Sequence, residues 1–457
     1  MKQLMGTTRV ITLLLAASLL AVPALARKVK LKNVSVENQN GNVLRKTVQF
    51  SSQTQGKVSV HWWETGTDEN KGRHTDDLAW ADTNRVVLNY LKANTTYSWS
   101  VHVLVGDGVV DVSKAQTFTT DALPDDLPKL TSTPTDKLAK GLPFEDYVLA
   151  NVRSSPALLY IFDAAGSIVW YEYMGKHVRP VTITPNNTLL TIRDKRTIVE
   201  LNTLGEILWE TNIPGNEGDT HLHHDVVTDG KGNYYTLGTI KKKVLVNNNG
   251  RTEGIEIGTD RIMQFNREGL LLWDWSLFDE LDAATDPRAL ELKGDWGHAN
   301  GLAIGAEGML AVSFRTLDEV WLLNPYDKRV EWKLGKQGNV VPPAHGQFLK
   351  QHAPHFLPNG DLMVFDNGEP NVREQSRVVT LKLNPLQGSA SVVHAINIPQ
   401  YLSSGKRGSA YPVNERQYLV CSTATSSFFV INRNEGITWR IQSDKAAYRA
   451  LPLENLP

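Results

Sequence analysis

The feature that most limits the fold of this chain is a repeated turn that precedes a tryptophan. An aspartate or asparagine opens each turn, and the tryptophan follows seven or eight residues later. Five copies span Asp163–Trp170, Asn202–Trp209, Asn266–Trp273, Asn324–Trp332 and Asn432–Trp439, and a sixth turn at Asn384 lacks the tryptophan. Each copy is typical of a β-hairpin that buries a large aromatic side chain. A repeat of roughly forty to sixty residues predicts the blades of a β-propeller, with the tryptophans as packing residues.

Histidines recur ahead of a second set of turns. The spacings are eight residues from His224 to Gly232, eight from His352 to Gly360, and ten from His298 to Gly308. Each histidine begins a short apolar strand that a glycine-containing turn joins to a second strand. Because the first strand of each propeller blade lines the central channel, the three histidines are expected at one channel mouth. His223 stays open as an alternative to His224, since only the register of the repeat favours the latter.

The six turns predict an all-β fold with a six-bladed β-propeller over residues 146–457. The blades are expected to start near Asp146, Arg179, His224, His298, His352 and Ser409. Residues 27–122 alternate in hydropathy, and Leu91 lies six residues before Tyr97, which resembles the tyrosine corner of a fibronectin-type-III-like β-sandwich. Residues 123–145 are expected to form a linker. The sandwich is expected to serve in packing or in forming a homodimer.

Residues 1–26 have the pattern of a secretory signal peptide: positive charge, a short apolar run, and a small-residue end at Ala26. The apolar run is shorter than the ~20 residues that a membrane span needs, and no later segment is long enough either. Cys421 is the only cysteine, so the chain cannot form an internal disulfide. A net charge of −1 gives no reason to propose a nucleic-acid partner.

Polar residues are also expected at the ends of the second strands. The second strand of a blade returns to the face where the first began, which brings Arg315, Asn367 and Thr423 toward the histidines. Arginine offers fixed forked donors, and histidine can donate, carry a proton or act as a nucleophile. This set suits an anion with several oxygen atoms.

Several short motifs, in this order and combination, resemble the bacterial arylsulfate sulfotransferases, which do not use the nucleotide sulfate donor. The motifs are His223-His224-Asp225, Trp296–Gly301, Ser313-Phe314-Arg315, Gln351-His352-Ala353, Phe365–Gly368 and Tyr448-Arg449-Ala450. The resemblance implies a periplasmic six-bladed propeller and ping-pong transfer between phenolic sulfates and phenols through a sulfated histidine. It implies no cofactor and no metal. The lone cysteine is a departure, because enterobacterial members carry a disulfide.

Carried over by motif, the resemblance assigns roles to individual residues. His352 would be the nucleophile, with His298, Arg315 and His224 as its polar partners. Asn300 would be a supporting group that contributes to substrate binding. Asn367 and Thr423 are expected to contribute to substrate binding from their positions at the ends of the second strands.

Two other functions stay open from the residues alone. Three histidines at a channel mouth could bind a divalent ion in a metal-dependent propeller lyase or hydrolase. A non-catalytic binding propeller of the quinoprotein type would have similar tryptophan repeats, but it would not need histidines at three blade starts.

Overall fold

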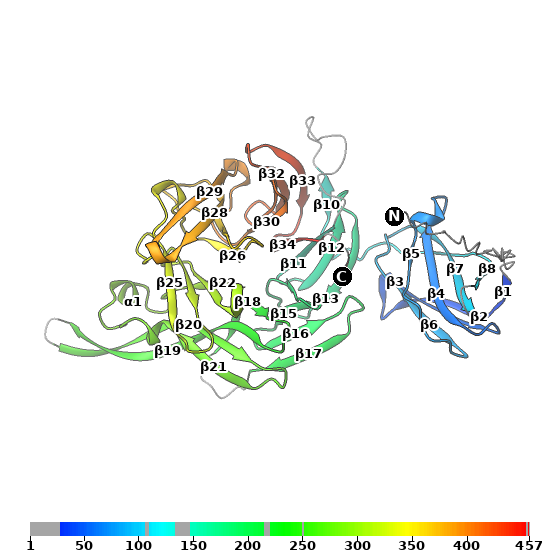
Figure 1. Cartoon of the computed structure of the whole chain (residues 1–457), viewed down its shortest axis with the longest axis horizontal. Helices are drawn as coiled ribbons and strands as arrows, with labels where there is room; N and C mark the ends of the chain where they lie inside the picture. Colours follow the sequence, from blue (N-terminus) through cyan, green and yellow to red (C-terminus); the bar gives the residue numbers. More distant parts are fainter. Residues whose placement is uncertain are drawn as a thin grey trace, which may run out of the picture. The chain divides into compact units, whose positions relative to one another are not determined.

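The computed structural model describes residues 28–105, 109–132, 147–213, 220–248, 251–453 and 456 (Figure 1). Within these ranges the chain is almost entirely β, and α1 (Pro287–Leu292) is the single α-helix. The predicted all-β class is therefore confirmed. The predicted signal peptide and most of the predicted linker lie outside the described residues. No helix in the described part of the chain is long and apolar enough to cross a membrane.

The chain divides into two compact units. The first contains the residues up to Glu37 together with Thr47–Leu88 and Thr96–Thr119, and the second contains the remainder, including Asn38–Lys46 and Asn89–Thr95. Short 3-10 turns occur at Glu69–Lys71, Leu277–Asp279, Ala306–Gly308, Ala344–Gly346, Pro385–Gln387 and Gln400–Leu402.

The N-terminal strands form two sheets. One has the order β1 (Lys28–Val29), β8 (Val109–Ser113), β7 (Thr96–Val105), β4 (Lys57–Glu64) and β5 (Arg73–His74), with β9 (Gln116–Thr119) also on β7. The other has the order β2 (Leu31–Gln39), β3 (Asn42–Ser52) and β6 (Asn84–Leu88). Phe50 of β3 packs on Trp99 of β7 with ring centroids 6.4 Å apart. This contact buries apolar side chains from both sheets in one core.

Six further sheets account for the other described strands. The first sheet has the order β34 (Ala447–Leu453), β11 (Tyr147–Val152), β12 (Leu158–Asp163), β13 (Ile168–Tyr173), and the second has β14 (Thr182–Ile183), β15 (Leu189–Arg193), β16 (Thr197–Leu201), β17 (Ile207–Asn212). The third has the order β18 (Leu222–Thr228), β19 (Tyr234–Asn248), β20 (Arg251–Phe265), β21 (Leu271–Ser276), and the fourth has β22 (Ala299–Ile304), β23 (Leu310–Phe314), β24 (Glu319–Leu323), β25 (Val330–Gly335). The fifth has the order β26 (His352–Phe356), β27 (Leu362–Asp366), β28 (Arg377–Asn384), β29 (Ser389–Asn397), and the sixth has β30 (Ser409–Asn414), β31 (Gln417–Ser422), β32 (Ser427–Asn432), β33 (Ile437–Ser443), β10 (Leu130–Ser132). We call the first strand of each series (β34, β14, β18, β22, β26 and β30) a leading strand.

The repeated turn has a clear local cause. Its opening Asp or Asn accepts backbone N–H groups from the residues that follow, as Asp163 does from Ala165 and Ser167. Asn432 does the same with Asn434 and Gly436. A short polar side chain that bonds its own backbone two to four residues on favours a tight turn.

Three of the five repeat tryptophans connect their sheet to another sheet. Trp170 of β13 donates its indole N–H to the carbonyl of Thr203, in the turn between β16 and β17. Trp209 donates in the same way to Arg267 of the following sheet. Trp439 of β33 donates to Ala164, which joins the last sheet in the sequence to the first.

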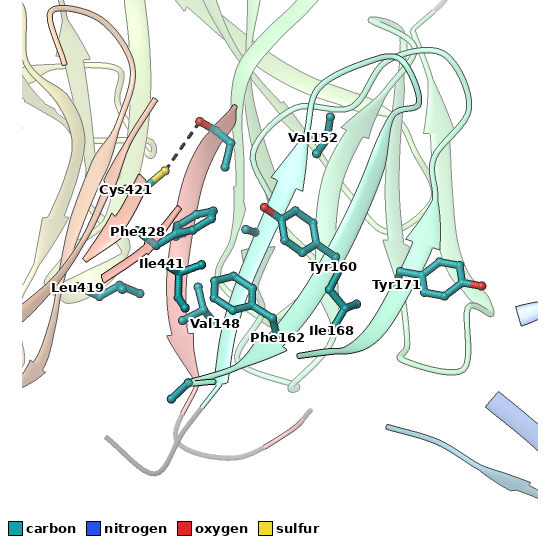
Figure 2. Close-up of a cluster of buried hydrophobic side chains, with 14 of the residues drawn as sticks. Val148, Val152, Tyr160, Phe162, Ile168, Tyr171, Leu419, Cys421, Phe428 and Ile441 are labelled. Atoms are coloured by element: carbon teal, nitrogen blue, oxygen red, sulfur yellow. Dashed lines mark hydrogen bonds between the residues drawn. The ribbon is translucent and has the colours of Figure 1, made fainter. Parts of the chain in front are cut away.

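The first sheet takes its leading strand from the far end of the chain. The sequence analysis expected this sheet to begin near residue 146, but β34 pairs with β11, with Ala450 opposite Ala150. This pairing hydrogen-bonds the β11 edge, which would otherwise be open. Figure 2 shows the shared core, where Phe162 faces Phe428 with ring centroids 5.0 Å apart. Cys421 is free and buried in this core.

Candidate functional site

A cavity of about 310 Å³ opens at the starts of two neighbouring leading strands, β18 and β22. Its lining includes seven basic side chains: Arg153, Arg179, Lys195, His221, His223, His224 and His298. Asp260 and Asp295 also line it. We call it the histidine cavity.

The structure brings the three predicted histidines together beside this cavity. The rings of His224 and His298 lie 5.2 Å apart. Tyr448, in β34, lies 6.2 Å from the His224 ring and 6.3 Å from the His352 ring. His352 itself does not line the cavity, because its side chain is covered and only 2% of the residue is exposed.

The histidines do not occupy one equivalent position in their strands. His352 pairs with Phe365 across a bulge that contains one extra residue. In β18 the residue paired at this place is His223, opposite Leu237, and the bulge contains two extra residues. His224 therefore lies within the bulge, with a positive φ of 55°. The longer bulge turns His224 toward His298, whereas His223 lies next to Asp260.

Two hydrogen bonds fix the tautomer of His352. The side-chain amide of Asn367 donates to the carbonyls of Ser404 and Arg407, at 2.6 and 2.7 Å, so its oxygen must face His352. Nδ1 of His352 lies 2.7 Å from that oxygen and therefore carries the ring proton. Nε2 is left with its lone pair and accepts the backbone N–H of Arg407 at 3.2 Å.

Burial keeps His352 neutral. It lowers the pKa of His352 to about 3, and the nearby charges of Arg315 and His298 act in the same direction. The hydrogen bond to Asn367 acts in the opposite direction but is outweighed. A neutral imidazole with a defined lone pair on Nε2 is the form that a nucleophile requires.

The other two histidines have different surroundings. His298 directs Nδ1 to the carboxylate of Asp295 at 2.8 Å, which orients the ring with Nε2 away from that carboxylate. Burial, followed by the neighbouring His223 and His298, lowers the pKa of His224 well below its usual value. Nε2 of His223 lies 3.2 Å from Asp260, although the geometry does not make a hydrogen bond.

The other predicted site residues are Arg315, Asn300, Asn367 and Thr423, and each makes a defined contact. Arg315 directly follows β23, its N–H donates to the carbonyl of His298 at 3.1 Å, and its charge acts on His352. Asn300 donates to the carbonyl of Gln351 at 2.7 Å and is buried, so it positions the residue before His352. Asn367 has both amide hydrogens and its oxygen engaged, so it acts through His352. Thr423 is buried, and its hydroxyl lies 3.4 Å from the carbonyl of Tyr448.

Several basic and aromatic neighbours of the histidines were not predicted as site residues. Arg407 lies with its guanidinium carbon 5.6 Å from the centre of the Tyr448 ring. Arg153 and Arg179 are each close enough to Arg407 and Tyr448 to interact electrostatically with them. Arg179 had been noted only as the start of a blade, and Tyr448 only as part of a closing motif. No local pattern marks Arg153 or Arg407, because each is brought in by a different sheet.

Asp225, which follows His224, and Arg449 form a buried ion pair. Arg449 of β34 donates two hydrogen bonds to the Asp225 carboxylate, at 3.0 and 2.6 Å, and Asp225 also accepts the N–H of Leu302. The pair therefore joins β34, β18 and β22. It holds Tyr448 and His224, the residues next to each partner, beside one another.

Among the described residues, no group of three or more His, Cys, Asp or Glu side chains could hold a metal ion. The histidines are instead engaged with Asn367, Asp295 and one another.

Comparison with known protein families gives a match over more than half of the chain. A family model described as Arylsulfotransferase (ASST) matches residues 131–448. No curated protein matches the chain significantly.

Solved structures resemble the chain only distantly. A protein of unknown function from Bacteroides caccae is 14% identical, with a TM-score of 0.46, over 68% of this chain and all of its own. A catalytically inactive virginiamycin B lyase from Staphylococcus aureus, crystallised with quinupristin, is 10% identical, with a TM-score of 0.37, over 68% of this chain and 88% of its own. Similarity at this level carries no conclusion about function.

Proposed function

The chain belongs to the arylsulfotransferase family, and from that premise we propose that it moves a sulfuryl group from a phenolic sulfate ester to an acceptor phenol. Transfer follows a ping-pong course through a sulfohistidine at His352. The observation that carries this assignment is the fixed tautomer of His352, which leaves the lone pair on Nε2, in a ring on which the charges of Arg315 and His298 act.

In the first half-reaction, Nε2 of His352 forms a bond to the sulfur of the aryl sulfate. The S–O ester bond breaks, and its electron pair leaves on the phenolate oxygen. Arg315 and the neighbouring histidines stabilise the charge on the sulfuryl and leaving oxygens. Because the backbone N–H of Arg407 covers Nε2, the incoming sulfuryl group must displace this contact. The freed N–H can then donate to a sulfuryl oxygen.

In the second half-reaction, an acceptor phenol attacks the sulfur of sulfohistidine. The N–S bond breaks and returns its electron pair to Nε2 of His352. His298 takes the phenol proton on Nε2, because its Nδ1 is held by Asp295. Asn367 retains the proton on Nδ1 of His352 throughout, which keeps Nε2 as the reacting atom.

The same proposal covers the architecture and the location of the enzyme. We propose that the six sheets are the blades of a closed propeller, supported by the β34–β11 pairing and the Trp439–Ala164 hydrogen bond. The two N-terminal sheets are proposed to form a sandwich, supported by the Phe50–Trp99 contact. A periplasmic location after cleavage at Ala26 and a homodimer remain proposals from the sequence.

The decisive experiment is to trap the covalent intermediate. The enzyme is mixed with 4-nitrophenyl sulfate without an acceptor, quenched rapidly and digested for mass spectrometry. An added sulfuryl group on the peptide containing His352, which disappears when phenol is supplied, is the expected result. The His352→Asn variant should form no adduct. Full turnover by the wild type without any adduct would overturn the sulfohistidine mechanism.

The metal-dependent alternative is tested on the same enzyme. Turnover should persist after prolonged dialysis against a chelator, because the proposed chemistry uses only protein side chains. Activity that disappears and returns with a divalent metal would favour a metal-dependent lyase or hydrolase instead.

A further inference from the structure

The histidine cavity has more positive charge than transfer of one sulfuryl group uses. An aryl sulfate monoester has a single negative charge, and Arg315 together with the histidines faces the reacting sulfuryl group in the proposed mechanism. Arg153 and Arg179 line the cavity in addition, and Lys195 lies at its exposed rim. These cations therefore have no role in the reaction as proposed so far.

Neither of the two arginines is neutralised by the protein. In the described part of the chain, no carboxylate pairs with Arg153 or Arg179, and the side chain of Arg179 donates no hydrogen bond. The two acidic residues of the cavity are engaged elsewhere. Asp295 holds His298, while Asp260 lies against His223 and accepts the N–H of Ala299.

Keeping the guanidinium of Arg179 charged and buried without a partner costs free energy. Arg179 is only 9% exposed, its Nε is buried without a partner, and the residue lines the cavity. Burial, followed by the charge of Arg153, lowers the pKa of Arg179 to about 10. Buried like charges of this kind are stabilised when an anion binds between them.

We propose that the substrate carries a second anionic group on its aromatic ring, and that Arg153 and Arg179 bind this group while His352 takes the sulfuryl group. This inference rests on the proposed sulfotransfer and specifies its substrate class as ring-borne oxyanions, with an aryl carboxylate as the best match. The forked guanidinium geometry suits a carboxylate. A volume of about 310 Å³ accommodates a single substituted ring.

The test compares substrates that differ only in the second charge. The enzyme is supplied with excess phenol and with 4-(sulfooxy)phenylacetate, its amide, or the corresponding methanesulfonate. The methylene group separates the charge from the ester oxygen, so the leaving groups are similar. Wild-type kcat/KM should be roughly 10-fold to 100-fold higher for the carboxylate than for the amide. The sulfonate arm distinguishes a carboxylate site from a general oxyanion site.

Substitutions of Arg153 and Arg179 then test whether these residues cause the preference for the carboxylate over the amide. Arg153→Gln and Arg179→Gln should each reduce the carboxylate-to-amide ratio toward one, whereas Arg329→Gln, which removes a largely exposed arginine paired with Glu331, should leave it unchanged. Should Arg179→Gln fail to fold, the partly exposed Arg153 carries the test alone. An undiminished ratio in Arg153→Gln would overturn the assignment.

The outcome also separates this inference from the proposed function. Turnover of 4-nitrophenyl sulfate together with equal kcat/KM for the carboxylate and the amide overturns the second anion site only. Absence of acceptor-dependent phenol release from every aryl sulfate overturns both.

Discussion

The two ends of the leading strands border cavities of very different character. The histidine cavity, at the strand starts, has a volume of about 310 Å³. A second cavity of about 1100 Å³ is lined by the strand ends and by Pro185, Pro354, Pro358, Pro412 and Pro452. We call this one the proline cavity. The larger cavity has the smaller share of ionisable side chains, since more than half of its lining residues are apolar and five are prolines.

Strand β26 contains two histidines: His352, which lies beside the histidine cavity, and His355, which lines the proline cavity. His352 has its Nδ1 held by a side chain that is itself anchored twice, which defines the lone pair on Nε2. His355 lines the proline cavity, bonds the carbonyl of Ala353 in its own strand, and stacks on Tyr411 at 4.5 Å. Burial lowers the pKa of both rings, so this effect alone does not distinguish them. The difference lies in the oriented partners and in the arginines beside them.

The sharpest way to break this comparison is to replace each histidine by asparagine. His352→Asn should lower turnover by at least about 10⁴-fold, because it removes the nucleophile. His355→Asn should change turnover by less than about threefold, because this residue faces the other cavity. Steady-state kinetics with 4-nitrophenyl sulfate and phenol measure both, after circular dichroism has established folding. Comparable losses in the two variants would contradict the assignment of the site.

The ion pair between the two cavities should affect stability more than chemistry. Arg449→Met leaves the buried carboxylate of Asp225 without its partner, which should lower the free energy of unfolding by about 3–5 kcal/mol. Urea denaturation measures the change. Replacing both partners, with Asp225→Leu and Arg449→Met together, should restore part of the loss. A double variant no more stable than the single one would argue against an uncompensated charge as the cause.

Arg315 should show the opposite behaviour. Arg315→Lys keeps the charge but loses the forked donors, and it should reduce kcat by about 10²–10³-fold with little change in stability. Stopped-flow measurement of nitrophenolate release tests the first half-reaction directly. Arg329→Lys, on the exposed surface, is the matched control and should turn over normally. A large loss of stability in Arg315→Lys would instead indicate a structural role.

The smallest expected effect is a pH dependence of stability, to which His352 and His355 contribute in the same direction. Burial lowers the pKa of His352 to about 3 and that of His355 to about 4, below the value of about 6.5 in an unfolded chain. At pH values between the folded and unfolded pKa of each histidine, the unfolded chain therefore binds a proton that the folded protein does not. Stability should be fully present above pH 6.5 and fall as the pH drops toward 4, by at most about 1.4 kcal/mol per pH unit for each histidine.

Urea midpoints at pH 7 and pH 5 measure this effect. The decline should be smaller in His352→Asn and in His355→Asn than in the wild type. An identical decline in all three proteins would mean that neither ring is held neutral in the folded state.

The sequence predicted the repeating β-hairpins well, because the turn chemistry of Asp163 and Asn432 is local. It also located the histidines, because apolar strands and turn glycines set their spacing. It could not decide between His223 and His224, since the extra residue in the β18 bulge shifts the count from the paired residue to the next turn by one, from eight to nine.

The sequence also gave no sign that Asn367 is fully engaged with His352 and two carbonyls. That fact depends on Ser404 and Arg407, which belong to another part of the chain. Arg153 was missed for the same reason, whereas Arg179 was expected at a blade start.

The pairing of β34 with β11 also sets an order of events during synthesis. The edge of β11 stays open while roughly three hundred further residues are made, because its partner strand is separated from it by that much chain. Contacts of such high sequence separation form slowly, and an open apolar edge can pair with another molecule in the meantime. We therefore expect the nascent chain to depend on chaperones until β34 is available, and its yield to be more sensitive to translation rate than its final stability is.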